Sequence, residues 1–72
     1  MVYREDTARY HVVKVRGMLN AAMRHCREGL EKVDEPDAQA IFETTADLLE
    51  KLITAYSHYE AELEEKTGGM AA

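Results

Sequence analysis

The sequence predicts an all-α protein, an antiparallel hairpin of two helices. In each half of the chain, apolar and small residues recur at alternating spacings of four and three residues, the repeat of helices that pack side by side. A segment with the chain's one proline separates the two halves. The predicted stripe, as we call these positions, comprises Ala8, Val12, Val15, Leu19, Ala22, Cys26, Gly29 and Val33, followed by Ala38, Phe42, Thr45, Leu49, Leu52, Tyr56, Tyr59 and Leu63.

The two halves of the predicted stripe match in size when they are opposed in antiparallel order. Gly29 then faces Phe42, and Ala22 faces Leu49. Such alternation of small and large residues lets facing layers interdigitate. A glycine inside a helix costs about 1 kcal/mol relative to alanine, and Phe42 offers a compensation for Gly29 because its ring would fill the space above it. The sequence offers no such compensation for Gly17.

The first helix is expected over about residues 7–32, after a short lead-in over residues 1–6. Asp6 or Thr7 can cap this helix, because a side-chain oxygen at that position accepts a hydrogen bond from a free backbone N–H group. The predicted boundary therefore lies directly before the first residue of the predicted stripe.

The turn is expected at residues 33–37 and the second helix at about residues 37–66. Pro36 favours the first turn of a helix, because it lacks an N–H group and its φ angle is already helical. Asp34 or Glu35 would be the cap of the second helix. The acidic residues around the proline also lie near the positive end of the helix dipole.

The end of the second helix is expected at Gly68 and Gly69, because glycine commonly terminates helices, with Lys66 near the negative end of the dipole. Residues 67–72 are then a frayed tail. With 72 residues, the chain has room for a single domain, which we assign to residues 1–72.

Charge is distributed unevenly between the two predicted helices. Residues 1–33 hold seven Lys and Arg against four Asp and Glu, a net +3, and residues 34–72 hold two against ten, a net −8, for a total of −5. A basic helix beside an acidic one favours antiparallel pairing over the pairing of like helices. The acidic balance also speaks against nucleic-acid binding, which depends on phosphate neutralisation.

The stripe is too broad for one neighbouring helix, and a chain of this size rarely supplies enough core on its own. We therefore expect either a homodimeric four-helix bundle or docking on a protein partner. The residues predicted to flank the stripe and to contact the partner are Met23, Leu30, Ile41, Leu48 and Ala55 on one side, and Met18 and Ile53 on the other.

No arrangement of residues predicts catalysis, a cofactor or a metal site. His11 and His25 lie about 21 Å apart along one helix, so they cannot share a metal ion. No hydroxyl or thiol has a histidine and an acid arranged for nucleophilic attack. We therefore expect a non-enzymatic protein. A metal or redox sensor built on Cys26 with His11, His25 and His58, or another homodimeric four-helix-bundle regulator, is the alternative.

The expected location is the cytoplasm. The first residues lack the apolar run of a signal peptide, and no stretch approaches the roughly 20 apolar residues that cross a bilayer. The single Cys26 cannot form an internal disulfide, which suits a reducing compartment. Its place in the predicted stripe indicates a buried, small apolar residue.

The run from Leu19 to Leu30 has the pattern Leu-x-Ala-Ala-x-x-x-Cys-Arg-x-x-Leu, and a Pro36-Asp37 turn and an apolar second helix follow it. Over roughly residues 12–56 this arrangement resembles the YscE-like small helical hairpins of type III secretion systems. The second helix continues with Tyr56, Tyr59 and Leu63 and is longer than expected of that family.

The resemblance implies a function as a small co-chaperone. In that family the hairpin acts with a larger, TPR-like helical-repeat chaperone, and together they keep the secretion needle subunit soluble and monomeric in the bacterial cytosol. The family has no catalytic residues that could be assigned to this chain. A co-chaperone of this kind must cover an apolar flank with another protein, which agrees with the breadth of the stripe.

Overall fold

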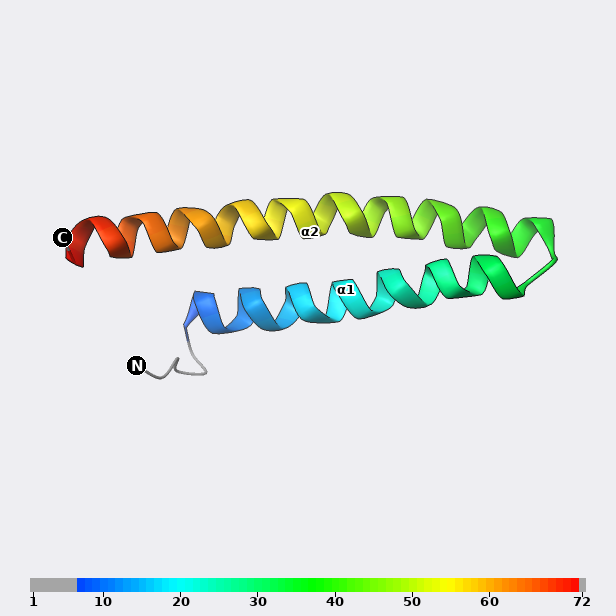
Figure 1. The fold of residues 1–72 in the computed structure, drawn as a ribbon, viewed down its shortest axis with the longest axis horizontal. Helices are drawn as coiled ribbons and strands as arrows, with labels where there is room; N and C mark the ends of the chain where they lie inside the picture. The colour runs from blue at the N-terminus through cyan, green and yellow to red at the C-terminus, as the bar shows by residue number, and fades with distance from the viewer. Residues whose placement is uncertain (1–6, 72) are drawn as a thin grey trace.

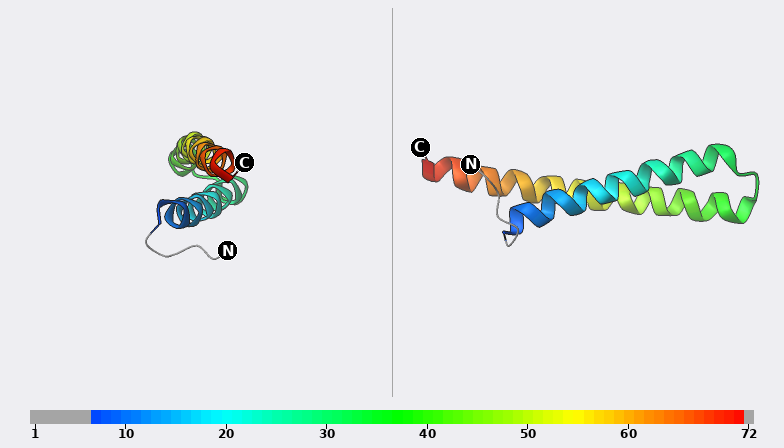
Figure 2. Two further views of the ribbon diagram at one scale, coloured as in Figure 1. Left: turned by 90° about the vertical axis from the view of Figure 1, so that its left-hand side faces the viewer. Right: turned by 90° about the horizontal axis from the view of Figure 1, so that it is seen from below.

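The structure, a computed structural model, describes the backbone of residues 7–71 and the side chains of residues 7–65. The described chain forms two helices, α1 (Ala8–Lys32) and α2 (Pro36–Ala71). They lie side by side in antiparallel order (Figure 1), and seen end-on they form a single pair (Figure 2). The molecule measures 54 × 19 × 15 Å. The predicted all-α antiparallel hairpin is therefore confirmed.

Helix α1 begins and ends where its local sequence supplies partners for the free backbone groups. Thr7 has extended backbone angles, and its side-chain oxygen accepts a hydrogen bond of 3.2 Å from the backbone N–H of Tyr10. This is the geometry of a helix cap, so Thr7 is the cap; Asp6, the other candidate, lies outside the described residues. At the other end, the N–H of Val33 donates to the carbonyl of Gly29 at 2.9 Å.

The turn is short and is held by its own hydrogen bonds. Residues 33–35 connect the helices, and Pro36 is the first residue of α2 as the sequence predicts. The N–H of Gln39 donates to the carbonyl of Glu35 at 2.9 Å, and its side-chain amide donates to the carbonyl of Val33 at 2.7 Å. Gln39 therefore joins the start of α2 to the end of α1.

Helix α2 is longer than predicted, because it continues through Gly68 and Gly69 to Ala71. The expected end at the glycine pair and the frayed tail over residues 67–71 do not appear in the backbone; Ala72 lies outside the described residues. Termination by glycine requires a left-handed backbone conformation, and among the described residues no glycine has a positive φ angle. Figure 1 shows α2 extending beyond the start of α1.

The two helices meet along a line that is rotated from the predicted stripe. We call this line the interhelix seam, and its members are half-buried apart from the buried Ala46. They follow the four-and-three repeat on both helices. The interhelix seam comprises Val12, Arg16, Leu19, Met23, Cys26, Leu30 and Val33 on α1, and Phe42, Ala46, Leu49, Ile53, Tyr56, Glu60 and Leu63 on α2.

Half of the predicted stripe is correct and half is displaced by one residue. Every seventh residue from Val12 and from Phe42 belongs both to the predicted stripe and to the interhelix seam. By contrast, the stripe residues Ala8, Ala22, Leu52 and Tyr59 are exposed. The physical reason is the breadth of the stripe, since one neighbouring helix can cover only one edge of it. The seam uses the edge at which Arg16 and Glu60 form an ion pair.

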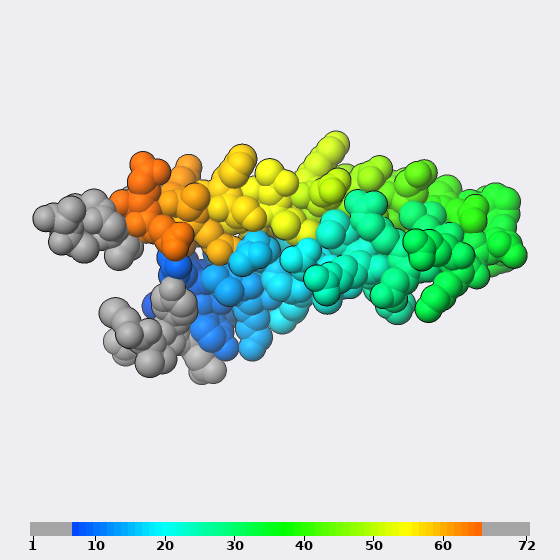
Figure 3. Space-filling view, viewed as in Figure 1, coloured from blue at the N-terminus to red at the C-terminus, as the bar shows by residue number. Residues whose placement is uncertain are grey.

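The core between two helices is thin. Side chains of α1 and α2 touch along the hairpin (Figure 3), yet among the described side chains Ala46, exposed by 1%, is the only buried one. The described residues include no large side chain that is fully buried. A chain of this size with so little buried apolar surface gains little stability from burial. We therefore expect most of its stability to come from association.

Gly29 is the position at which close packing requires glycine, and this gives a test of the seam. A Cβ atom at residue 29 would lie 2.9 Å from Cε2 of Phe42, whereas one at Gly17 would have nothing within 4 Å. We expect Gly17→Ala to stabilise the protein by about 1 kcal/mol through helix propensity. Gly29→Ala should destabilise it, because displacing the Phe42 ring costs about 1–3 kcal/mol. Denaturant unfolding of both variants checks this, and equal gains would contradict the packing of Phe42 on Gly29.

Candidate interaction face

One side of the hairpin carries the positions that directly precede the interhelix seam on each helix. Each residue advances about 100° around an α-helix, so these side chains point roughly a quarter turn away from the seam. In an antiparallel pair that quarter turn leads to the same side on both helices. A shallow groove lined by Val12 of α1 and by Ala55, Tyr56 and Tyr59 of α2 crosses between the helices there.

We call this side the open face. Its residues are His11, Val15, Met18, Ala22, His25 and Gly29 on α1, and Ile41, Thr45, Leu48, Leu52, Ala55 and Tyr59 on α2. These twelve residues include no Asp, Glu, Lys or Arg; the positions that precede Val33 and Leu63, at the two ends of this side, are the charged Lys32 and Glu62. On α2 these positions repeat the four-and-three spacing of the interhelix seam, which makes them a second line suited to lengthwise packing against a helix.

The open face is apolar as well as uncharged. The exposed fractions of Met18, Ile41, Leu48, Leu52 and Tyr59 lie between 42% and 63%. Single exposed apolar residues are common on protein surfaces, but a contiguous patch of them indicates an interaction site. These five residues form such a patch because they share one side of a straight hairpin. The exposed apolar residues therefore indicate docking of a protein partner or self-association.

The opposite side of the hairpin has the reverse character in the half nearer the turn. The positions that directly follow the seam include Arg24, Arg27, Glu43, Asp47 and Glu50. Arg27 and Glu50 form an ion pair between the helices at 3.6 Å, and both side chains are about half exposed or more. We call this the charged side. Its charges favour contact with water, so of the two sides the open face is the one suited to a protein contact.

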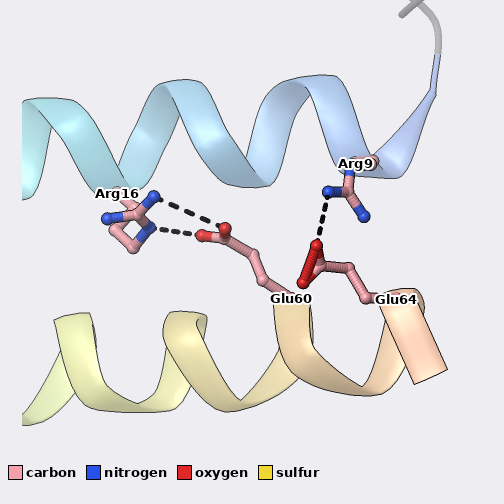
Figure 4. A network of polar contacts seen from close by, with 4 residues as sticks. All are labelled: Arg9, Arg16, Glu60 and Glu64. Atoms are coloured by element: carbon pink, nitrogen blue, oxygen red, sulfur yellow. Dashed lines mark hydrogen bonds and ion pairs between the residues drawn. The ribbon is translucent and has the colours of Figure 1, made fainter. Parts of the chain in front are cut away.

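Two further ion pairs join the helices near the start of α1 (Figure 4). Arg16 donates two hydrogen bonds to the carboxylate of Glu60, one of them at 3.4 Å, and these side chains are only 32% and 17% exposed. Arg9 donates to Glu64 at 3.3 Å on a more exposed part of the surface. The pairs connect the basic half of the chain to the acidic half in antiparallel order, as the charge distribution predicts.

The structure divides the predicted partner-contact residues into two groups. Met18, Ile41, Leu48 and Ala55 are exposed and lie together on the open face. The remaining three, Met23, Leu30 and Ile53, are half-buried in the interhelix seam and are not part of that face.

Sequence reasoning missed Leu52 and Tyr59 as members of the open face, because it placed both inside the predicted stripe. The signal that could have identified them is the ion pair of Arg16 with Glu60. Two long charged side chains at facing positions of a four-and-three repeat indicate which edge of a broad stripe lies in the seam. Once that edge is assigned to the seam, the residues that directly precede the seam residues, Leu52 and Tyr59 among them, lie on the open face.

The residues considered for metal or redox chemistry lie apart. His11 and His25 are exposed on the open face, His58 is exposed on α2, and Cys26 is half-buried in the seam. Within residues 7–65, no three His, Cys, Asp or Glu side chains come together in a group that could hold a metal ion. None of the helices in the described part of the chain is long and apolar enough to cross a membrane.

The half-buried position of Cys26 predicts slow modification by a thiol reagent. Seam contacts with α2 restrict access to its Sγ atom, whereas unfolding exposes it fully. We expect the native rate to be at least tenfold below the rate in denaturant, in line with an opening cost of about 1.4 kcal/mol or more. Thiol labelling followed by mass spectrometry measures both rates. Equal rates would favour the redox-sensor alternative.

No protein-family model, curated protein or solved structure gives a significant match to this chain. What the structure has in common with the YscE-like resemblance is the two-helix antiparallel hairpin.

Proposed function

We propose that this protein is a non-enzymatic interaction module that docks its open face on the helices of another protein. The observation that carries this proposal is the contrast between the two sides of the hairpin. Between Lys32 at one end and Glu62 at the other, the open face has no charged residue and exposes Met18, Ile41 and Leu48, while the other side is charged in the half nearer the turn. A partner that covers the open face removes apolar surface from water at about 25 cal/mol per Å².

We further propose that the module works as a small co-chaperone in the cytoplasm. Its partners would be a helical-repeat chaperone and a secreted subunit, which the assembly keeps soluble and monomeric. This step is supported by the resemblance over residues 12–56 to the YscE-like hairpins of type III secretion. It is also supported by the shape of the surface, since a straight face with a heptad line of apolar residues fits between the parallel helices of a repeat protein.

Leu48→Glu should abolish partner binding, because it places a charge at the middle of the open face, where a docked helix would bury it without a counter-ion. The matched control is Ser57→Glu, which adds the same charge to an exposed position on the charged side of α2. We expect a tagged wild-type chain and the Ser57 variant to retain a helical-repeat chaperone and a small secreted protein from the native cells, at comparable yield.

The Leu48 variant should lose these proteins by tenfold or more, which mass spectrometry of the captured material measures. Circular dichroism of each variant separates loss of binding from loss of helix. Equal capture by the two Glu variants would contradict the assignment of the open face. Capture of proteins with no helical repeat would contradict the co-chaperone proposal while leaving the interaction module in place.

A further inference from the structure

The apolar residues of each helix are centred between the interhelix seam and the open face. The predicted stripe combines seam residues such as Leu49 and Tyr56 with open-face residues such as Leu52 and Tyr59. Its middle therefore points about 50° away from the neighbouring helix, since successive residues differ by about 100° around the axis. The polar edge of the apolar surface, at Arg16 and Glu60, faces the neighbour instead.

This offset distinguishes two architectures. In a two-stranded coiled coil the apolar stripe points straight at the single partner helix. In a four-helix bundle each helix has two neighbours, and its stripe points between them toward the centre of the bundle. Both helices of this chain show the second arrangement, and they are offset toward the same side. The hairpin is therefore built as one half of a four-helix bundle.

We infer that the other half is a second copy of this chain, related by a two-fold axis parallel to the helices. Such an axis places α2 of each copy against α1 of the other, so every helix has two antiparallel neighbours. This inference rests on the proposed function, because it concerns the same open face: the second copy covers that face in the isolated protein, and a docking partner takes its place. A two-fold axis perpendicular to the helices would instead place α2 beside α2.

Charge favours the parallel axis. Residues 1–33 carry a net +3 and residues 34–72 a net −8, so contact between α2 and α1 of the second copy pairs opposite signs on every edge of the bundle. The perpendicular axis would bring two strongly acidic helices together, which repel each other. Three ion pairs within the hairpin show the same preference, since Arg9–Glu64, Arg16–Glu60 and Arg27–Glu50 each join a basic α1 residue to an acidic α2 residue.

Side-chain size also fits this arrangement. A two-fold axis along the bundle leaves the height of every residue along the helices unchanged. The pairs Arg16–Glu60 and Arg27–Glu50, which show the residues at equal height within one hairpin, therefore also show the residues at equal height across the new interface. Leu52 then lies level with the segment from Ala22 to His25 of the second copy. Met18 lies level with the segment from Ala55 to Tyr59. Large side chains thus insert beside alanines, which is knobs-into-holes packing.

Mixed disulfide formation tests the arrangement directly. Ala22→Cys and Leu52→Cys are made separately in the full-length chain carrying Cys26→Ala, so that each protein has one thiol. In the inferred dimer, residue 22 of one copy faces residue 52 of the other, whereas residues of the same number lie on diagonally opposed helices. After mixing and mild oxidation, we expect a covalent dimer that contains one chain of each variant and little product from either variant alone.

The matched control is a mixture of the variants Arg24→Cys and Glu50→Cys. Residues 24 and 50 lie at about the same height along the hairpin, as residues 22 and 52 do, but they are on the charged side. This mixture should give at least tenfold less cross-linked product. Efficient cross-linking of Leu52→Cys with itself would overturn the inference in favour of α2 against α2. Absence of any selective cross-link would also overturn it, as would a monomer mass for the wild type in light scattering.

These measurements use the purified chain without a partner, so they are independent of the test of the proposed function. Selective cross-linking together with failed chaperone capture would make the open face a self-association surface only. Retained capture without cross-linking would leave the interaction module standing and exclude the second copy as its occupant.

Discussion

The free energy of unfolding is expected to increase by about 1.4 kcal/mol for each tenfold rise in protein concentration. This follows from mass action, because a dimer that unfolds to two monomers is stabilised by the presence of more chains. The full effect is expected because the isolated hairpin has so thin a core, with Ala46 as the only buried residue among the described side chains, that unfolding is coupled to dissociation. Thermal melts followed by circular dichroism over a wide range of concentrations measure it.

Leu52→Glu supplies the control for this prediction. Leu52 is 47% exposed in the hairpin, so the substitution removes little packing within one chain, but in the bundle it would bury a charge between the copies. We expect this variant to melt at a lower temperature that no longer depends on concentration. A wild-type midpoint that is independent of concentration would contradict self-association through the open face.

Replacing both Arg16 and Glu60 with leucine is expected to stabilise the protein by about 1 kcal/mol, the lower end of the range for replacing a buried ion pair by apolar residues, because this pair is only half-buried. The pair lies in the interhelix seam, where the remaining members are mostly apolar. Two leucines would extend the apolar contact by one layer and remove the desolvation cost of both charges.

Each single variant should be less stable than the wild type, unlike the double variant, and the two losses in the free energy of unfolding should differ in size. Arg16→Leu leaves the Glu60 carboxylate, which is 17% exposed, without its arginine partner; we expect a loss of about 3 kcal/mol. Glu60→Leu should cost less, because the long side chain of Arg16, already 32% exposed, can carry its charge outward to water.

Denaturant unfolding of the wild type, both single variants and the double variant forms the thermodynamic cycle that separates the pair from its surroundings. The exposed pair of Arg27 and Glu50 on the charged side serves as the comparison. Replacing both of its members with glutamine should change stability by less than about 1 kcal/mol. A destabilised double-leucine variant would show that Arg16 and Glu60 contribute more than their desolvation costs.

Local features of the fold were predictable because they depend on few residues close in sequence. Thr7 is the cap, Pro36 starts α2, and Gly29 packs against Phe42, each as expected from the sequence. The end of α2 was not, because a glycine pair can continue a helix at a modest cost when no left-handed conformation is adopted. Local propensity therefore located the helix starts and missed the last helix end.

The candidate site was predictable only in part, because it depends on how far each helix rotates about its axis. Met18, Ile41, Leu48 and Ala55 were placed outside the predicted stripe, and the structure leaves all four exposed. Leu52 could have packed between the two helices or lain exposed on the open face, since the apolar stripe is wide enough to pack along either of its two edges. The apolar pattern alone does not say which seam is used within the chain and which remains outside; the charged residues Arg16 and Glu60, at facing positions of one of the two seams, mark the one that is used.

Pro36 prevents the two helices from merging into one rod. If residues 33–35 became helical, two straightened chains could exchange their second halves and lock together as an entangled pair. A proline within such a continuous helix would lack its hydrogen bond and would collide with the carbonyl of Lys32. In the inferred dimer each chain therefore contributes a closed hairpin, and the two copies meet as separate halves instead of exchanging their second helices.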